Sequence, residues 1–107
     1  MVVIAYGSVA RSAKRAAKDL RLRGVKAGLL KLDTLWPFMR SAVESLLAAE
    51  NGQTPARVLV VPEMNIGQIS REVKRVNQGR ARVVGINRTD GTIITPQEIA
   101  DRVLEVL

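Results

Sequence analysis

The segment VLVVPEMNIGQISREV (residues 58–73) carries a strand, a turn and the start of a helix in a short space. Its first four residues form an apolar run that is typical of a buried strand, and a helical spacing resumes after Gly67. Between the two, Glu63, Asn65 and Gln68 surround that glycine. A buried strand that turns directly into a one-sided helix is half of a βαβ unit, which predicts a parallel sheet.

The same alternation runs through the whole chain of 107 residues. The patterns predict strands over 2–6, 25–33, 57–61 and 81–86, helices over 9–23, 39–50 and 68–77, and a short extended piece over 92–94. A last helix is predicted from an N-cap at Thr95, with proline at the next position and Glu98 at the third. We therefore predict a single domain of the α/β class, with three αβα layers and a small, doubly wound, mainly parallel sheet in the order 2-1-3-4. Strands covered on both faces place these residues in the core: Val3, Ile4, Leu30, Leu59, Val60 and Val84.

The composition excludes several classes of chemistry. The sequence has no cysteine and no histidine, which excludes disulfides, thiolate ligands and histidine acid–base catalysis. No apolar run approaches the roughly 18 residues that a membrane span needs, and no signal peptide opens the sequence. We expect a soluble, cytoplasmic protein with no membrane partner.

The net charge of +7 raises the question of nucleic-acid binding. One basic cluster falls on the outer side of the first helix, and a second falls on the third helix. Neither cluster is interleaved with aromatic residues that could stack on bases. We interpret both as solvated helix faces or as a surface for an acidic partner, and we expect no nucleic acid. The two clusters are Arg11, Lys14, Arg15 and Lys18, and Arg71, Lys74 and Arg75.

Ligands of such sheets meet the carboxyl ends of the strands where the strand order reverses, here between the first and third strands. The turn at Gly7 lacks the further glycines of a dinucleotide-binding motif, and the sequence has no P-loop. Asp33 stands where a ribose-binding acid would lie, but such an aspartate more often caps a turn. Glu63 has no second acid or base nearby in the sequence to form a catalytic pair. The other interpretation is a hydrogen-bonded turn in which Glu63, Asn65 and Gln68 cap the third helix.

Four segments together resemble one known domain. They are similar, in the same order and over essentially the whole chain, to the carboxyl-terminal, transketolase-C-like domain of the α subunit of 2-oxoacid:ferredoxin oxidoreductases. The strings EMNIGQ and TPQEI most resemble the 2-oxoglutarate ferredoxin oxidoreductases. The four segments are AYGSVARSA (5–13), GVKAGLLKLDTLWPF (24–38), VVPEMNIGQISREV (60–73) and GTIITPQEI (91–99).

This resemblance implies a thiamine-diphosphate enzyme that decarboxylates a 2-oxoacid and forms an acyl-CoA, with electrons passing through iron–sulfur clusters to ferredoxin. For 2-oxoglutarate the products are succinyl-CoA, CO2 and reduced ferredoxin. In that family the thiamine diphosphate, its magnesium and the clusters lie on other domains or chains, so we expect no catalytic, cofactor-binding or metal-binding residue here. The implied partners are a β subunit that carries the thiamine site and a ferredoxin-like subunit, with ferredoxin and coenzyme A serving the whole enzyme. We expect the chain to be a fragment or small subunit of a larger enzyme and to be inactive alone.

The polar turn then has a second interpretation. We predict that it forms an edge that docks onto neighbouring domains, because buried polar groups at an interface need partners. The competing hypothesis is a free-standing module that binds a nucleotide or another phosphate at Gly7-Ser8 and Gly67-Gln68. The residues of the predicted interface edge are Gly7, Ser8, Glu63, Asn65, Gly67 and Gln68.

Overall fold

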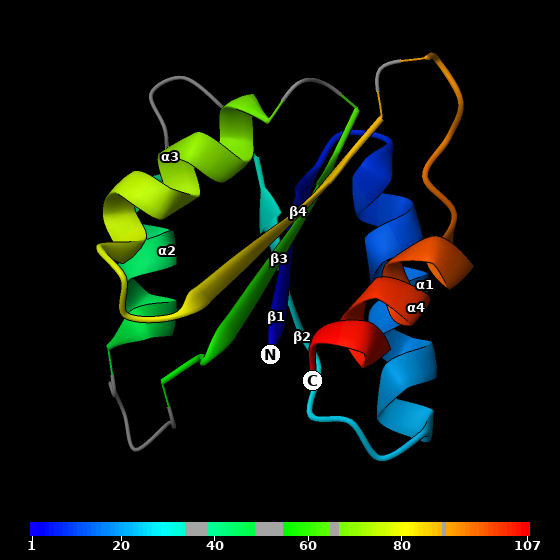
Figure 1. Cartoon of the computed structure of the whole chain (residues 1–107), viewed down its shortest axis with the longest axis horizontal. Helices are drawn as coiled ribbons and strands as arrows, with labels where there is room; N and C mark the ends of the chain where they lie inside the picture. The colour runs from blue at the N-terminus through cyan, green and yellow to red at the C-terminus, as the bar shows by residue number, and fades with distance from the viewer. Residues whose placement is uncertain (34–38, 49–54, 65–66, 89) are drawn as a thin grey trace.

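A computed structural model describes residues 1–33, 39–48, 55–64, 67–88 and 90–107. Four parallel strands form one sheet in the order β2-β1-β3-β4, and the helices flank it (Figure 1). The predicted class, layers and strand order are confirmed. The elements are β1 (Val2–Tyr6), α1 (Val9–Leu22), β2 (Gly28–Leu32), α2 (Arg40–Leu47), β3 (Val58–Glu63), α3 (Gln68–Asn77), β4 (Arg82–Asn87) and α4 (Pro96–Val106).

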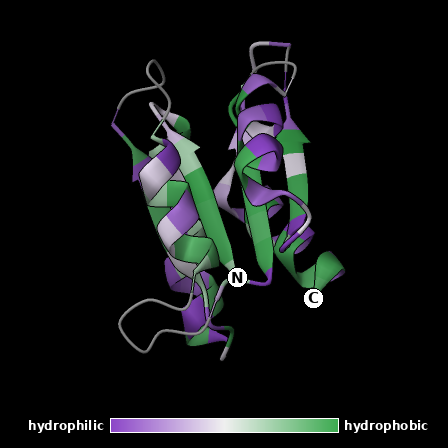
Figure 2. Cartoon of the chain, turned by 90° about the vertical axis from the view of Figure 1, so that its left-hand side faces the viewer, coloured by the Kyte–Doolittle hydropathy of each residue, from purple (hydrophilic) through white to green (hydrophobic). Residues whose placement is uncertain are grey.

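The sheet has a separate hydrophobic core on each face. Helices α1 and α4 cover one face, where they pack on Val3, Val60 and Val84. Helices α2 and α3 cover the other face, where Ile4 and Leu59 are fully buried. Figure 2 shows hydrophobic strands between helices that alternate in hydropathy along their length. This double coverage explains why the inner strands read as continuous apolar runs in the sequence.

The predicted core is confirmed at five of its six positions; Leu30 is only half-buried. The prediction for Leu30 was wrong because β2 lies at the edge of the sheet, where one side of the strand has no neighbouring strand. Residues Gly28 and Leu29 of the same strand are half-buried as well. Central β1 and β3 therefore carry the core, and β2 contributes a partly exposed border.

Several element boundaries differ from the sequence prediction, and β2 begins at Gly28 instead of at residue 25. Strand β3 continues through Pro62 to Glu63 instead of ending at Val61. Pro62 lies opposite Ile86 of β4 and beyond the pairing of β3 with β1, which is at Val2 and Val3, so its missing N–H removes no rung of the β1 ladder. The predicted extended piece at residues 92–94 forms no strand.

Helix termini follow the sequence signals. Helix α1 ends before Gly24, which has a φ of +86°, a backbone conformation that favours glycine. Helix α4 begins with a complete capping box between Thr95 and Glu98. The string LWPF of the resemblance falls outside the described residues. In the described ranges, no helix combines the length and the apolar character that crossing a membrane requires.

Candidate functional site

The turn from β3 to α3 is organised by the side chain of Glu63. This residue is fully buried at the carboxyl end of β3. Its Oε1 accepts a hydrogen bond from the backbone N–H of Ile69 at 3.0 Å, and its Oε2 accepts one from the N–H of Ser70 at 2.9 Å. These N–H groups belong to the first turn of α3, where helix geometry leaves them without an internal partner. Glu63 therefore caps the helix from a position well before its N-cap.

Gly67 is the N-cap of α3 and makes this capping possible. Its φ is +92°, in the left-handed region that favours glycine. A Cβ at this position would lie 3.3 Å from Ser70 Oγ and 3.6 Å from Asn87 Nδ2. The Ser70 hydroxyl donates to the Gly67 carbonyl at 3.0 Å and closes the turn. The chain can therefore bend back under the helix only where a side chain is absent.

This arrangement argues against an anion site at the start of α3. A helix N-terminus attracts phosphate through its exposed N–H groups and its dipole. Here two of those N–H groups already bond to a carboxylate from the same chain. A phosphate would have to displace a buried negative group that occupies the position it needs. The phosphate-binding hypothesis for Gly67-Gln68 finds no support in this geometry.

The same contacts leave Glu63 no role as a general base. Both of its oxygens are bonded within the domain, and no surface of the residue is exposed. The backbone is held too, because the Arg88 N–H donates to the Glu63 carbonyl at 3.0 Å. Of the two sequence interpretations for Glu63, the structure confirms the helix cap. Its side chain joins the end of β3 to the first turn of α3.

The rest of the predicted interface edge divides into accessible and enclosed residues. Gly7, Ser8 and Gln68 are exposed, whereas Gly67 is buried and Asn65 falls outside the described residues. Strands β1 and β3 pair directly, and their register, continued along both strands, brings Tyr6 level with Glu63. The turn at Gly7 therefore leaves the same edge of the sheet as the Glu63 turn, as the topology predicted. Docking at this edge stays a prediction, and it rests on Gly7, Ser8 and Gln68.

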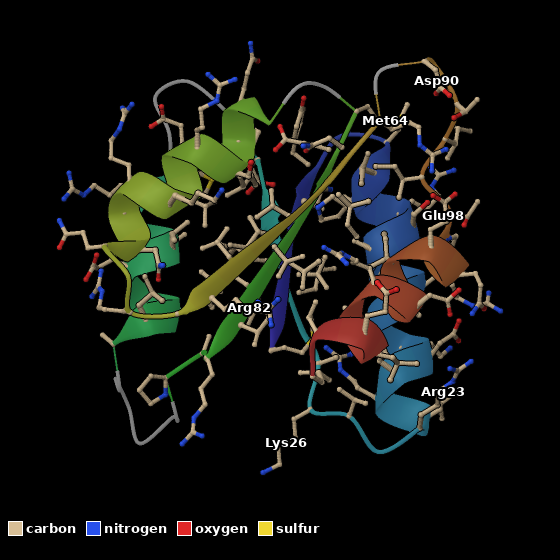
Figure 3. The ribbon with its side chains drawn as sticks, in the orientation of Figure 1. Arg23, Lys26, Met64, Arg82, Asp90 and Glu98 are labelled. Atoms are coloured by element: carbon tan, nitrogen blue, oxygen red, sulfur yellow. The ribbon has the colours of Figure 1, made fainter. Side chains whose placement is uncertain are left out.

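The loop after β4 is braced at the same edge. Asp90 Oδ1 accepts hydrogen bonds from the Thr92 hydroxyl at 2.6 Å and the Thr92 N–H at 3.0 Å. The hydroxyl bond is the main reason that the pKa of Asp90 lies below its usual value. Arg88 donates to Thr92 Oγ1 at 2.7 Å and pairs with Glu98 of α4. Figure 3 shows Asp90 and Met64 at one end of the molecule and Lys26 at the other.

A hollow lies at the amino edge of the sheet, at the opposite end of the strands from the Gly7 and Glu63 turns. It has a volume of about 1080 Å³. Residues of both chain ends, Met1 and Leu107, line it together with segments 24–28 and 55–58. The predicted crevice between β1 and β3 lies at the carboxyl edge, beside residues that are not described, and it stays a prediction. No sequence signal marks the hollow, since it is formed by loops brought together only by the sheet.

Among the described residues, no three carboxylates lie together as possible metal ligands. The buried carboxylate of Glu63 is committed to backbone N–H groups. The sequence also supplies no thiolate for a cluster. Asp33 is exposed at the end of β2, next to residues that are not described.

Two polar contacts escaped the sequence prediction. Buried Asn77, at the end of α3, donates to the Ala81 carbonyl at 2.7 Å and accepts from the Ala81 N–H at 2.8 Å. The Arg80 guanidinium makes a bidentate pair with the Glu44 carboxylate of α2, in which its two terminal nitrogens donate at 2.6 and 2.8 Å. Asparagine before a glycine turn is a signal that could have indicated the first contact. The second joins residues far apart in the sequence and has no local signal.

Comparison with known proteins identifies the domain. Residues 1–99 match the family described as pyruvate:ferredoxin oxidoreductase core domain II. The chain belongs to this family. The match covers all four strands, helices α1 to α3 and the first turn of α4.

The curated relatives agree with this assignment. The chain is 39% identical over 104 residues to 2-oxoglutarate synthase subunit KorA of Methanothermobacter marburgensis, which is 97% of this chain and 26% of the relative. It is 42% identical over 106 residues to the same subunit of Methanothermobacter thermautotrophicus, which is 99% of this chain and 27% of the relative. Ketoisovalerate oxidoreductase subunit VorB of Methanothermobacter marburgensis is 34% identical over 106 residues, 99% of this chain and 28% of the relative. The chain thus spans about a quarter of the length of these relatives.

Solved structures share the fold. A 2-oxoglutarate:ferredoxin oxidoreductase from Magnetococcus marinus, with 2-oxoglutarate, coenzyme A and succinyl-CoA bound, matches with a TM-score of 0.72 at 20% identity, over 97% of this chain and 17% of that one. A split-gene transketolase, described as an inactive β4 tetramer, matches with a TM-score of 0.74 at 23% identity, over 97% of this chain and 37% of that one. The fold is therefore that of transketolase-like and 2-oxoacid oxidoreductase domains, as the resemblance implied.

Proposed function

We propose that this domain is part of a thiamine-diphosphate-dependent 2-oxoglutarate:ferredoxin oxidoreductase. The complete enzyme would convert 2-oxoglutarate and coenzyme A to succinyl-CoA and CO2 and reduce ferredoxin. The observation that carries the proposal is identity of 35–42% with four 2-oxoglutarate synthase subunits over at least 94% of this chain. Identity with the two ketoisovalerate subunits is lower, at 32–34%. This order favours 2-oxoglutarate over a branched 2-oxoacid.

Within that enzyme the domain would be a structural, interface-forming part. In its candidate site the Glu63 carboxylate is buried, and both of its oxygens accept hydrogen bonds from the start of α3. The exposed residues Gly7, Ser8 and Gln68 at the carboxyl edge would face the neighbouring domains. The thiamine diphosphate and the clusters would be held by other domains or by partner subunits, in the cytoplasm.

The substrate is tested on the assembled enzyme from the source organism. We expect coenzyme-A-dependent reduction of ferredoxin with 2-oxoglutarate at the highest kcat/KM, compared with 2-oxoisovalerate and pyruvate. A higher kcat/KM with 2-oxoisovalerate would contradict the assigned substrate. No coenzyme-A-dependent reduction with any of the three would contradict the assigned reaction.

The interface role is tested by adding bulk at one edge residue. Gln68→Trp should weaken association between this domain's polypeptide and its partner subunits in gel filtration, because its position at the start of α3 faces the proposed neighbour. Gln97→Trp is the matched control, since Gln97 is also an exposed glutamine in the first turn of a helix. If both variants eluted at the same volume as the unmodified enzyme, the result would contradict an interface at Gln68.

A further inference from the structure

Helix α1 carries an unusual excess of positive charge. Its fourteen residues include five basic side chains and one acid, so more than half of the chain's net charge of +7 lies on this helix. Four of the basic residues, all exposed, follow one another along its outer face at helical spacing. We call this row the α1 basic stripe; its members are Arg11, Lys14, Arg15 and Lys18.

The stripe breaks two local rules of helix stability. Like charges three and four residues apart repel each other, and the stripe contains several such pairs. Its first member, Arg11, lies in the first turn, where the helix dipole disfavours a cation. That turn has no acidic residue, and the Ser8 side chain makes no capping bond. A helix that keeps such conflicts commonly does so for a function outside its own folding.

The domain itself does little to neutralise the stripe. Among the described residues, its single ion pair joins Arg15 to Asp19 within the same helix, at 3.5 Å. Helix α4 packs beside α1 and has an excess of acids, yet its ion pairs go elsewhere: Glu98 pairs with Arg88, and Glu105 pairs with Arg102. The lysines of the stripe form no ion pair in the part of the chain that the structure describes.

We propose that the α1 basic stripe docks against an acidic surface of another polypeptide of the same enzyme. The inference rests on the proposed function in one respect, that the domain works inside a larger assembly. The stripe begins one turn after Gly7-Ser8, so it is continuous with the exposed residues of the predicted interface edge. From Arg11 to Lys18 it extends over about 10 Å, at 1.5 Å per residue, which suits two or three carboxylates on a facing element.

The surroundings of the stripe favour a protein partner over the other polyanions. Helix α1 has no aromatic residue on which a base could stack. Its apolar side is buried by the sheet and α4, with Ala13, Ala16 and Leu20 fully covered. Leu22, the last residue of the helix, is exposed, but a single leucine does not make a hydrophobic face that could insert into a lipid surface. An acidic surface of a folded protein could neutralise the stripe and needs neither an aromatic residue nor an exposed hydrophobic face on α1.

A carbodiimide that couples lysine amines directly to carboxylates provides the first test on the assembled enzyme. Mass spectrometry should find Lys14 or Lys18 joined to an aspartate or glutamate of another polypeptide of the enzyme. Cross-links from these lysines only to acids of their own polypeptide would overturn the proposal, and so would an absence of any cross-link. The readout needs no turnover, so it is independent of the 2-oxoacid that the enzyme oxidises.

Charge reversal provides the second test. Lys18→Glu should weaken association of the subunits by up to about tenfold at low salt and by much less at high salt, because an exposed ion pair is both lost and replaced by repulsion. Folding should be preserved, since the new glutamate lies three residues from both Arg15 and Arg21. Sedimentation velocity in low and high potassium chloride measures the change.

Lys74→Glu is the matched control, because Lys74 is an exposed lysine on the outer face of α3, with no ion pair among the described residues. It should leave association unchanged. Equal effects of the two reversals would overturn the proposal by showing a general charge effect. RNA that copurifies with the enzyme and is lost in Lys18→Glu would overturn it in favour of a nucleic-acid surface.

Discussion

A glutamate side chain caps the N-terminus of both α3 and α4, but the two glutamates lie at different positions relative to the helix that they cap. In α4, Glu98 lies within the helix and reaches back to the Thr95 N–H, while the Thr95 hydroxyl accepts from the Glu98 N–H at 3.2 Å. In α3, Glu63 belongs to the preceding strand and reaches forward across the turn to the first turn of the helix. The α4 cap lies at the surface, whereas the α3 cap is fully buried.

The two caps differ in what they join: one connects residues within a single helix end, and the other connects a strand to a helix. The Thr95 capping box stabilises a single helix end, because both partners lie within four residues. The Glu63 cap ties β3, the centre of the sheet, to the helix that covers it. Its loss would leave two buried N–H groups without partners, and an unsatisfied buried donor costs more than a normal hydrogen bond contributes. The α3 junction should therefore be much more sensitive to substitution than the α4 junction.

The largest effect is expected for Glu63→Gln. The amide keeps the volume but places an NH2 group against a backbone N–H, which removes one acceptor and the favourable charge at the helix N-terminus. We expect a loss of about 2–3 kcal/mol in the free energy of unfolding, measured by urea denaturation. This is larger than the change of about 1 kcal/mol that a simple surface turn would suggest.

The same substitution at Glu98 serves as the control. Glu98→Gln changes a half-exposed cap whose backbone partners can bond to water instead, so we expect a loss of less than about 1 kcal/mol. If both variants lost the same amount, burial would not distinguish the two caps, and the comparison between the junctions would fail.

The next effect separates backbone strain from crowding at Gly67. Gly67→Ala forces a side chain into the left-handed region and places a Cβ 3.3 Å from Ser70 Oγ. We expect a loss of about 1–2 kcal/mol in thermal or urea unfolding. Gly24→Ala has a similar φ of +86° with no atom within 4 Å of the new Cβ, so it reports the strain alone. A larger loss at Gly24 than at Gly67 would contradict the close packing of the Glu63 turn.

The two junctions also explain which parts of the structure the sequence could predict. The Thr95-Pro96-Gln97-Glu98 signal is local, and the start of α4 followed directly from it. Apolar runs and helical spacing likewise gave the strand order and most of the core. Glu63 could be recognised as unusual, but its partners depend on how α3 sits over the end of β3. Leu30 was misjudged for the same reason, because a strand's place at the sheet edge is a property of the whole sheet.

A smaller effect is expected at the local cap itself. Thr95→Ala removes the hydroxyl that accepts from the Glu98 N–H, and we expect a loss of about 1 kcal/mol in urea denaturation. Ser8→Ala is the matched control, because Ser8 occupies the N-cap of α1 without making a side-chain capping bond. That variant should be close to neutral. A Thr95→Ala variant as stable as Ser8→Ala would mean that the capping box contributes nothing.

The smallest effect should come from the exposed link between α2 and the end of α3. The hydrogen bonds from Arg80 hold the pKa of Glu44 below its usual value. A carboxyl with a lowered pKa in the folded state stabilises the fold above its unfolded pKa, and the contribution is lost as the pH falls through the folded pKa. The free energies of unfolding of the unmodified chain and of Glu44→Gln should therefore differ slightly at neutral pH and converge on acidification.

Potassium chloride should also shrink this difference, because both side chains are exposed, whereas the loss from Glu63→Gln should persist in salt. A Glu44→Gln difference that survives both acid and salt would show that this link is structural in the way that the Glu63 cap is.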